Sequence, residues 1–169
     1  SRTVLWAQNA DQSELPASTT KMMTALVTLE QFDLADQITV TTGYNIGQHV
    51  GFKPGETLTV EQLLYALLVQ SANDAAEILA ENYPGGRPAF IAAMNSKAGE
   101  IHLTNTHFAN PTGVDEEGHY STAADLARLA DVALRHPVFA KIVATENAVV
   151  ATHVLTNLNQ LLGKIPGVV

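Results

Sequence analysis

A serine and a lysine three residues apart stand directly before an apolar, helix-like run of the sequence. Ser18 and Lys21 precede residues 22–29, so a helix beginning there would put both side chains on one face, a turn apart. A serine hydroxyl is a poor nucleophile until a base takes its proton, and a lysine amine one turn away can be that base. The first turn of a helix also presents unpaired N–H groups and partial positive charge, which suits developing negative charge. The spacing indicates a serine nucleophile activated by a lysine.

The same spacing has a purely structural explanation. Six serines and five lysines in 169 residues predict about 0.2 such pairs by chance. Ser18 or Thr19 could cap the helix and leave Lys21 in solvent. The spacing alone does not separate the two interpretations.

A second polar pair follows the hydrophobic stretch 63–69. Ser71 and Asn73 fall where one helix should stop and another begin, so a hydroxyl and a carboxamide can point into one cavity. Asn73 is also a good N-cap for a helix over 74–82, and both interpretations can hold together. The presence of this second pair favours the catalytic interpretation of the first.

Four segments, in order along nearly the whole chain, carry a family resemblance. They read PASTTKMMTALVTLE, VGFKPGETLTVEQLLYALLVQSANDAAEILAE, NTHFANPTGV and HYSTAADLARLA. The chain resembles the serine-type D-Ala-D-Ala carboxypeptidases, the low-molecular-mass penicillin-binding proteins, which share the Ser-x-x-Lys spacing with class A β-lactamases. The resemblance implies an α+β fold of the β-lactamase/transpeptidase type, with a helical cluster packed on an antiparallel sheet. It implies one domain, over residues 1–169.

The resemblance also implies a role for each candidate residue. Ser18 resembles the acylated nucleophile and Lys21 its general base. Ser71 resembles the proton-relay serine, and Asn73 resembles the residue that binds the substrate's amide. The implied substrate is a peptidoglycan stem peptide ending in D-Ala-D-Ala, and β-lactam antibiotics that mimic it would trap Ser18. Neither a cofactor nor a metal is expected. To act as the base, Lys21 must be neutral, so its pKa should fall from about 10.4 through burial or a positive neighbour.

One motif of that family is absent from these residues. The family carries Lys-Thr-Gly, or a close variant, on a strand lining the far wall of the site. Neither Lys-Thr-Gly nor Lys-Ser-Gly occurs here, and residues 161–169 resemble the segment that leads up to that strand. The expected sheet is therefore incomplete, and the chain is expected to be part of a catalytic domain. A C-terminal segment or a second polypeptide would complete such a site.

Composition argues against several other classes of function. A net charge of −8 without a basic stripe disfavours binding to nucleic acid or to an anionic membrane. The absence of cysteine excludes disulfides, Cys-ligated zinc and thiol catalysis. No signal peptide and no run of about 18 apolar residues is present. Since members of the family are usually exported, the expected location is the periplasm or the outer face of the cytoplasmic membrane.

The histidines and an acidic triplet are expected to be structural or solvated. The six histidines include no His-Glu-x-x-His pair and no tight metal spacing. His119 lies beside a helix cap, so a local hydrogen bond is expected of it rather than catalysis. The acidic residues 115–117 lack the alternating oxygen ligands of a calcium loop, which predicts a solvated surface.

The pattern of apolar and cap residues predicts a mainly helical body. Helices are expected over 21–31, 59–69, 74–83, 88–99, 122–135 and 137–143. Thr59 and Gln62 match a capping box at the start of the second of these, and Thr122 is expected to begin the fifth. Strands are expected over 4–7, 38–41 and 148–154. The long polar loop 104–120, with a turn at 110–113, is expected to border the site.

Alternatives to the carboxypeptidase remain open. A β-lactamase or a D,D-endopeptidase would share the fold. A class A β-lactamase needs a deacylating glutamate on a loop; Glu100, Glu116 and Glu117 lie near loops, but in no segment that resembles that one. A non-catalytic cell-wall-binding relative would keep the fold without the chemistry, and it would have no reason to retain all four candidate residues.

Overall fold

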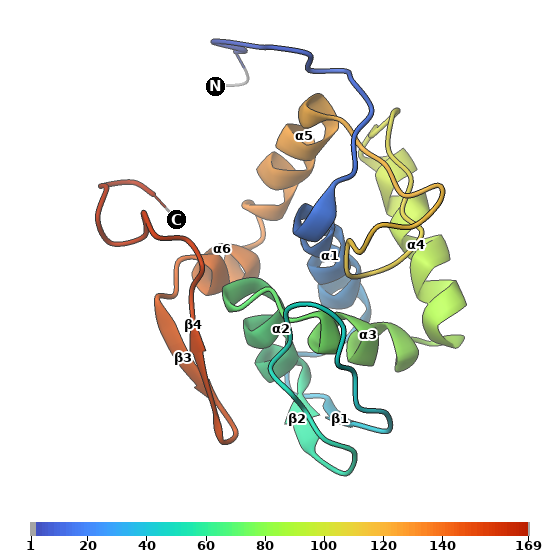
Figure 1. Ribbon diagram of the computed structural model, residues 1–169, viewed down its shortest axis with the longest axis vertical. Helices are drawn as coiled ribbons and strands as arrows, with labels where there is room; N and C mark the ends of the chain where they lie inside the picture. The colour runs from blue at the N-terminus through green and yellow to red at the C-terminus, as the bar shows by residue number, and fades with distance from the viewer. Residues whose placement is uncertain (1–2, 169) are drawn as a thin grey trace.

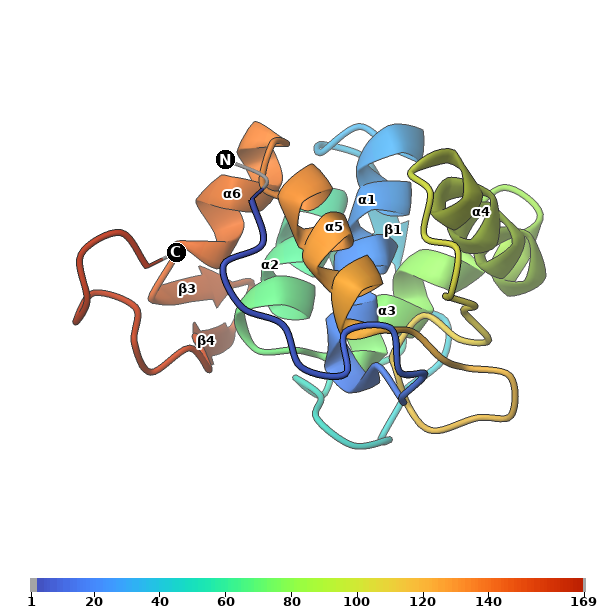
Figure 2. The same cartoon turned by 90° about the horizontal axis from the view of Figure 1, so that it is seen from above.

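The fold is arranged around one central helix. In the computed structural model, which describes residues 3–168, α1 (Lys21–Gln31) packs against four other helices (Figure 1). They are α2 (Val60–Val69), α3 (Asn73–Glu81), α4 (Gly86–Glu100) and α5 (Ala123–Ala133). Seen from above, α1 lies between α5 on one side and α4 on the other (Figure 2). Residues 23–28 of α1 are all buried, as expected of a helix that is apolar around most of its circumference.

The strands pair into two small antiparallel sheets. β1 (Gln37–Thr39) pairs with β2 (Thr57–Thr59), and β3 (Asn147–Val150) pairs with β4 (His153–Thr156). The β3–β4 hairpin and the short helix α6 (Pro137–Val143) both pack on α2 (Figure 1). Helices with small antiparallel sheets confirm the predicted α+β class. In the described residues, no helix combines the length and the apolar character needed to span a bilayer.

Two helix starts follow the predicted capping chemistry. At α2 the Thr59 hydroxyl accepts from the Gln62 N–H (3.2 Å), and the Gln62 side chain accepts from the Thr59 N–H (2.9 Å). At α5 the Thr122 hydroxyl accepts from the Asp125 N–H (3.2 Å). A cap of this kind contributes about 1 kcal/mol, so both helix starts are well determined by sequence.

Three local predictions are wrong. Residues 4–7 form no strand, because strand-forming side chains need a pairing partner and none of the described residues supplies one. The single strand predicted over 148–154 is a hairpin, since Ala151 (φ +50°) turns the chain between β3 and β4. Asn73 does not cap its helix: Ala72 holds the N-cap position of α3, and no side chain caps it.

Candidate active site

The serine–lysine pair lies where a short 3₁₀ turn runs directly into α1. The turn η1 (Ala17–Thr20) has three residues per turn, so side chains three apart line up one above the other. Lys21 Nζ accordingly lies 3.1 Å from Ser18 Oγ and donates a hydrogen bond to it. The pair predicted from spacing is therefore in direct contact.

Lys21 is not in solvent, which overturns the structural explanation of the spacing. Its side chain is buried, with the residue only 2% exposed. No side chain caps η1 or α1, and the Thr19 hydroxyl instead donates to the Pro16 carbonyl. Burial lowers the pKa of Lys21 to about 8, because desolvation penalises the ammonium form. The expected fall in the pKa of Lys21 through burial is confirmed.

A backbone carbonyl orients the lysine amine. Lys21 Nζ donates to the Thr112 carbonyl oxygen at 2.7 Å, in addition to its contact with Ser18. A neutral amine has two hydrogens and one lone pair, and a carbonyl can only accept. With one hydrogen directed to Thr112, the lone pair is available for the Ser18 hydroxyl. Sequence reasoning placed the loop near the site but missed this carbonyl, because a backbone contact leaves no signal in residue type.

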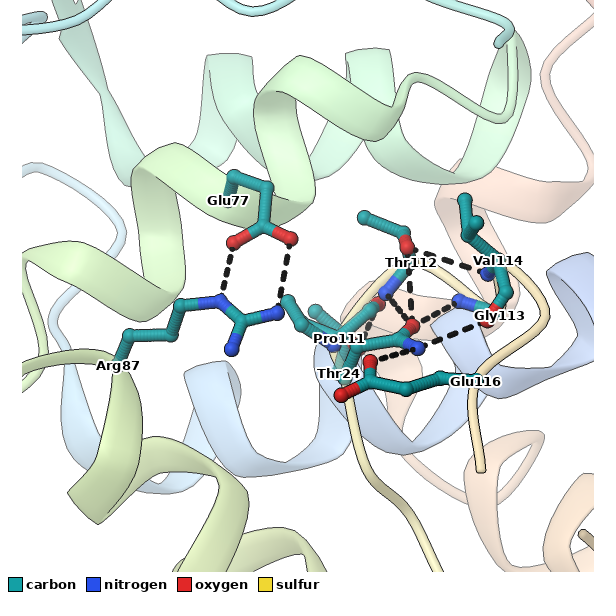
Figure 3. A network of polar contacts seen from close by, with 9 residues as sticks. Thr24, Glu77, Arg87, Pro111, Thr112, Gly113, Val114 and Glu116 are labelled. Carbon is teal, nitrogen blue, oxygen red and sulfur yellow. Dashed lines mark hydrogen bonds and ion pairs between the residues drawn. The ribbon is translucent and has the colours of Figure 1, made fainter. Parts of the chain in front are cut away.

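A turn built around Asn110 fixes that carbonyl. Asn110 Oδ1 accepts from the N–H groups of Thr112 (3.1 Å) and Gly113 (2.8 Å) and from the Thr112 hydroxyl (2.9 Å). Asn110 Nδ2 donates to the Val114 carbonyl (2.8 Å) and to Glu116 Oε2 (2.9 Å). One buried side chain thus organises the whole turn, whose residues Thr112, Gly113 and Val114 are labelled in Figure 3.

Side-chain contacts also join the helices around this turn. Thr24 Oγ1 of α1 donates to the Pro111 carbonyl at 2.7 Å, which ties the turn to the helix that carries Lys21. Figure 3 also shows Arg87 of α4 on Glu77 of α3, a two-pronged ion pair with N···O distances of 2.8 and 3.3 Å. The lysine and its acceptor therefore belong to one packed unit.

Ser71 shares a cavity with the serine–lysine pair. Ser18, Lys21 and Ser71 line one space of about 270 Å³. Ser71 (φ +58°) and Ala17 (φ +47°) are both in the left-handed region, which costs a non-glycine residue about 1–2 kcal/mol. Such strain concentrates at functional sites. The rest of the lining comes from apolar side chains of α1, α2, α5 and α6 and from the residue that follows α5: Met22, Leu67, Leu68, Ala130, Phe139, Val143 and Leu134.

Asn73 lies outside the lining of this cavity. Its Nδ2 donates to the Ile46 carbonyl (2.9 Å), and its backbone N–H donates to the Gln48 carbonyl (2.7 Å). The residue is 8% exposed. The structure thus brings Ser18, Lys21 and Ser71 together and ties Asn73 to the neighbouring loop.

The acidic and histidine residues do not form a metal site in the part of the chain that the structure describes. Among residues 3–168, no cluster of three or more His, Asp or Glu side chains could hold a metal ion. Residues 115–117 are exposed, as the sequence predicted. His119 makes hydrogen bonds, as predicted, but they are not local: its partners Ala109 and Thr20 lie 10 and 99 positions away.

Comparison with known proteins gives the family. The family described as D-alanyl-D-alanine carboxypeptidase matches residues 1–166. The chain belongs to this family. The resemblance found in the sequence is confirmed.

Individual members of the family show how far the similarity extends. The D-alanyl-D-alanine carboxypeptidase DacF of Bacillus subtilis is 35% identical over 98% of this chain and 46% of its own length. A D-alanyl-D-alanine endopeptidase of Pseudomonas aeruginosa is 35% identical over 88% of this chain and 49% of its own. The chain thus spans about half the length of these relatives. The crystal structure of a putative penicillin-binding protein homolog from Mycobacterium tuberculosis matches with a TM-score of 0.91 and 36% identity, over 96% of this chain and 65% of that one. The predicted β-lactamase/transpeptidase-like fold is confirmed.

Proposed function

We propose that this chain carries the acylation site of a serine D-Ala-D-Ala carboxypeptidase within one catalytic domain. The enzyme would remove the terminal D-alanine of peptidoglycan stem peptides through a Ser18 acyl-enzyme, and it would act outside the cytoplasmic membrane. The observation that supports the proposal most is the 3.1 Å contact between Ser18 Oγ and a buried Lys21 whose pKa is lowered to about 8. A lysine in that state can accept a proton near neutral pH.

Acylation follows from the positions of these groups. Neutral Lys21 takes the proton of Ser18 as its oxygen attacks the penultimate D-alanine carbonyl. The Ser18 N–H precedes the first intrahelical hydrogen bond of η1, from Thr19 N–H to the Pro16 carbonyl (3.2 Å), and is available to the oxyanion. One such donor contributes about 3 kcal/mol to transition-state stabilisation. The proton then passes by way of Ser71 to the leaving D-alanine, and water hydrolyses the acyl-enzyme.

Asn73 is assigned the substrate's amide in this proposal. One hydrogen of its Nδ2 is directed to the Ile46 carbonyl, which leaves the second hydrogen and Oδ1 for the amide of the substrate. The Asn73 side chain is held by a carbonyl of the neighbouring loop and not by α3, the helix that begins at Asn73.

Covalent labelling by a penicillin tests the proposal. We expect the 169-residue chain to gain the mass of one penicillin, and Ser18→Ala to gain none while it keeps the same circular dichroism spectrum. Because no Lys-Thr-Gly or Lys-Ser-Gly occurs in these residues, the same measurement shows whether the Ser18 and Ser71 motifs suffice for acylation. An unmodified parent chain, or equal labelling of Ser18→Ala, would contradict the proposal.

A D,D-endopeptidase is the second candidate, because one relative carries that name. The acylation chemistry would be the same, and only the leaving group would differ. Free D-alanine released from a pentapeptide stem supports the carboxypeptidase, whereas cleavage of a crosslinked dimer supports the endopeptidase. A β-lactamase has less support, since Glu100, Glu116 and Glu117 do not line the cavity that holds Ser18.

Replacing Gly113 with alanine should disturb the nucleophile without unfolding the protein. Gly113 has φ +86°, and a β-carbon there would collide with the Ala17 carbonyl and lie 3.1 Å from the Ser18 nitrogen. We expect acylation by penicillin to slow at least tenfold. Gly55→Ala is the matched control, because Gly55 has φ +92° and nothing within 4 Å of its would-be β-carbon. Both variants carry the same backbone strain, so equal acylation rates would show that the close approach at Gly113 is unimportant.

A further inference from the structure

His119 joins the two parts of the chain that hold the lysine. Its ring is buried, and the residue is 2% exposed. Ring Nδ1 accepts from the Ala109 backbone N–H at 2.9 Å, and Nε2 lies 2.8 Å from the hydroxyl of Thr20, which is fully buried. Thr20 immediately precedes Lys21, and Ala109 immediately precedes the turn whose carbonyl accepts from Lys21.

The two hydrogen bonds fix the protonation state of the ring. A backbone N–H can only donate, so Nδ1 of His119 must be unprotonated to accept from Ala109. A neutral ring of that kind carries its hydrogen on Nε2 and donates it to Thr20. A protonated ring would set an Nδ1 hydrogen against the Ala109 N–H at 2.9 Å, and that contact would be lost. The hydrogen-bonded bridge from Thr20 through His119 to Ala109 therefore exists only while His119 is neutral.

We infer that His119 is a positioning residue that holds Lys21 and the Thr112 carbonyl in register for proton transfer from Ser18. The inference rests on the proposed function. On one side, the ring fixes the last residue of η1, from which the Lys21 backbone continues. On the other side, it fixes the entry to the turn that presents the Thr112 carbonyl.

The surroundings of His119 keep the ring neutral at physiological pH. Burial lowers the pKa of His119 below its usual 6.5, and the nearby His107 acts in the same direction. The carboxylates of Glu116 and Asp115 oppose this shift, although burial outweighs them. The ring also packs edge-on against Phe108, with centroids 5.9 Å apart.

This positioning role predicts how the acylation rate depends on pH on the acidic side of the profile. Lys21 is active as the neutral amine, so the acylation rate falls tenfold per pH unit below a pKa of about 8. Once His119 also takes up a proton, the bridge is lost, and this second protonation lowers the acylation rate further. The slope of log rate against pH should then rise from one towards two.

The experiment compares the pH profile of penicillin acylation in the parent with His119→Asn and His119→Gln. The Asn side chain can still accept from Ala109 but does not reach Thr20, whereas the longer Gln side chain reaches Thr20. Neither side chain titrates. We expect both variants to be about tenfold slower at pH 7 and to keep a slope of one. The parent should approach a slope of two below the pKa of His119, located by NMR of its ring. The exposed His102, whose φ of +59° suits asparagine, provides the control: His102→Asn should keep the parent's rate and profile.

A second readout separates this inference from the proposed function. NMR titration of the Lys21 side chain requires no acylation, and we expect its shift and pKa to change in both His119 variants. Changed Lys21 signals without labelling of any chain would overturn the proposed function and leave the positioning role standing. Labelling of parent and His119 variants at equal rates, with unchanged Lys21 signals, would overturn the positioning role. A parent slope of one through the titration of His119 would do the same.

Discussion

Replacing Lys21 with methionine should lower the rate constant for acylation of Ser18 by penicillin about 10³-fold near pH 8. Methionine fills the buried space of the lysine stem but has no nitrogen to accept the Ser18 proton 3.1 Å away. General-base catalysis typically contributes 10²- to 10⁴-fold. The time course of the mass increase measures the rate, and the exposed Lys53 provides the control as Lys53→Met. A Lys21→Met rate within tenfold of the parent would remove Lys21 from the role of base.

The same substitution should change how stability depends on pH. The pKa of Lys21 is about 8 in the folded chain, against 10.5 for an ordinary lysine, so between these values the unfolded state binds more protons. Stability of the parent therefore rises with pH across this window, and below pH 8 the burial of the charge costs on the order of 3 kcal/mol. Lys21→Met lacks this contribution. Denaturant unfolding at pH 7.5 and pH 10 should show the parent gaining stability relative to the variant, and parallel changes would contradict the low pKa.

The sequence predicted the contact between Ser18 and Lys21 but not the surroundings that bury the lysine. Spacing showed that Ser18 and Lys21 would share a helix face, yet it could not choose between a buried and a solvated lysine. That choice depends on the loop around Asn110, about 90 positions along the chain, which covers the amine. The loop was recognised as bordering a site because long ordered loops do, but its contribution is a carbonyl, and any residue type provides one. Contacts of this kind need the fold.

The wrong strand and cap predictions have a common physical cause. Local propensity describes which residues suit a conformation, whereas a strand needs a partner and a cap needs a free helix end. Residues 148–154 have the right side chains for one strand, but Ala151 turns the chain and makes two. Asn73 has a good capping side chain, but α3 begins one residue earlier than predicted, so Ala72 holds the N-cap position. Thr59, whose partner Gln62 is three residues away, was predicted correctly because both members of the contact are local.

Asp74 should be among the most costly side chains to alter. It is fully buried, and its carboxylate accepts from the backbone N–H groups of Val50 (3.2 Å), Gly51 (2.8 Å), Phe52 (3.2 Å) and Ala75 (3.0 Å). In Asp74→Asn one carboxylate oxygen becomes an NH₂ group, which faces these donors with hydrogens of its own. Hydrogen bonds to a charged acceptor contribute about 1.5–3 kcal/mol each, and a buried N–H group left without an acceptor costs a similar amount. We expect Asp74→Asn to lower the free energy of unfolding by about 3 kcal/mol.

The loss of the Asp74 hydrogen bonds should also affect Asn73, because one loop contacts both residues. The segment 46–52 is held by Asp74 at one end, and at the other it supplies the carbonyls of Ile46 and Gln48 that bind Asn73. Loosening the first contact releases the second, so faster hydrogen exchange at the amides of residues 50–52 should accompany the loss of stability. Asp36→Asn is the control, since that exposed carboxylate accepts only from the Asp33 N–H (2.9 Å) among the hydrogen bonds described, and it should cost less than about 1 kcal/mol. Equal losses in the two variants would mean that the buried carboxylate does not hold the loop.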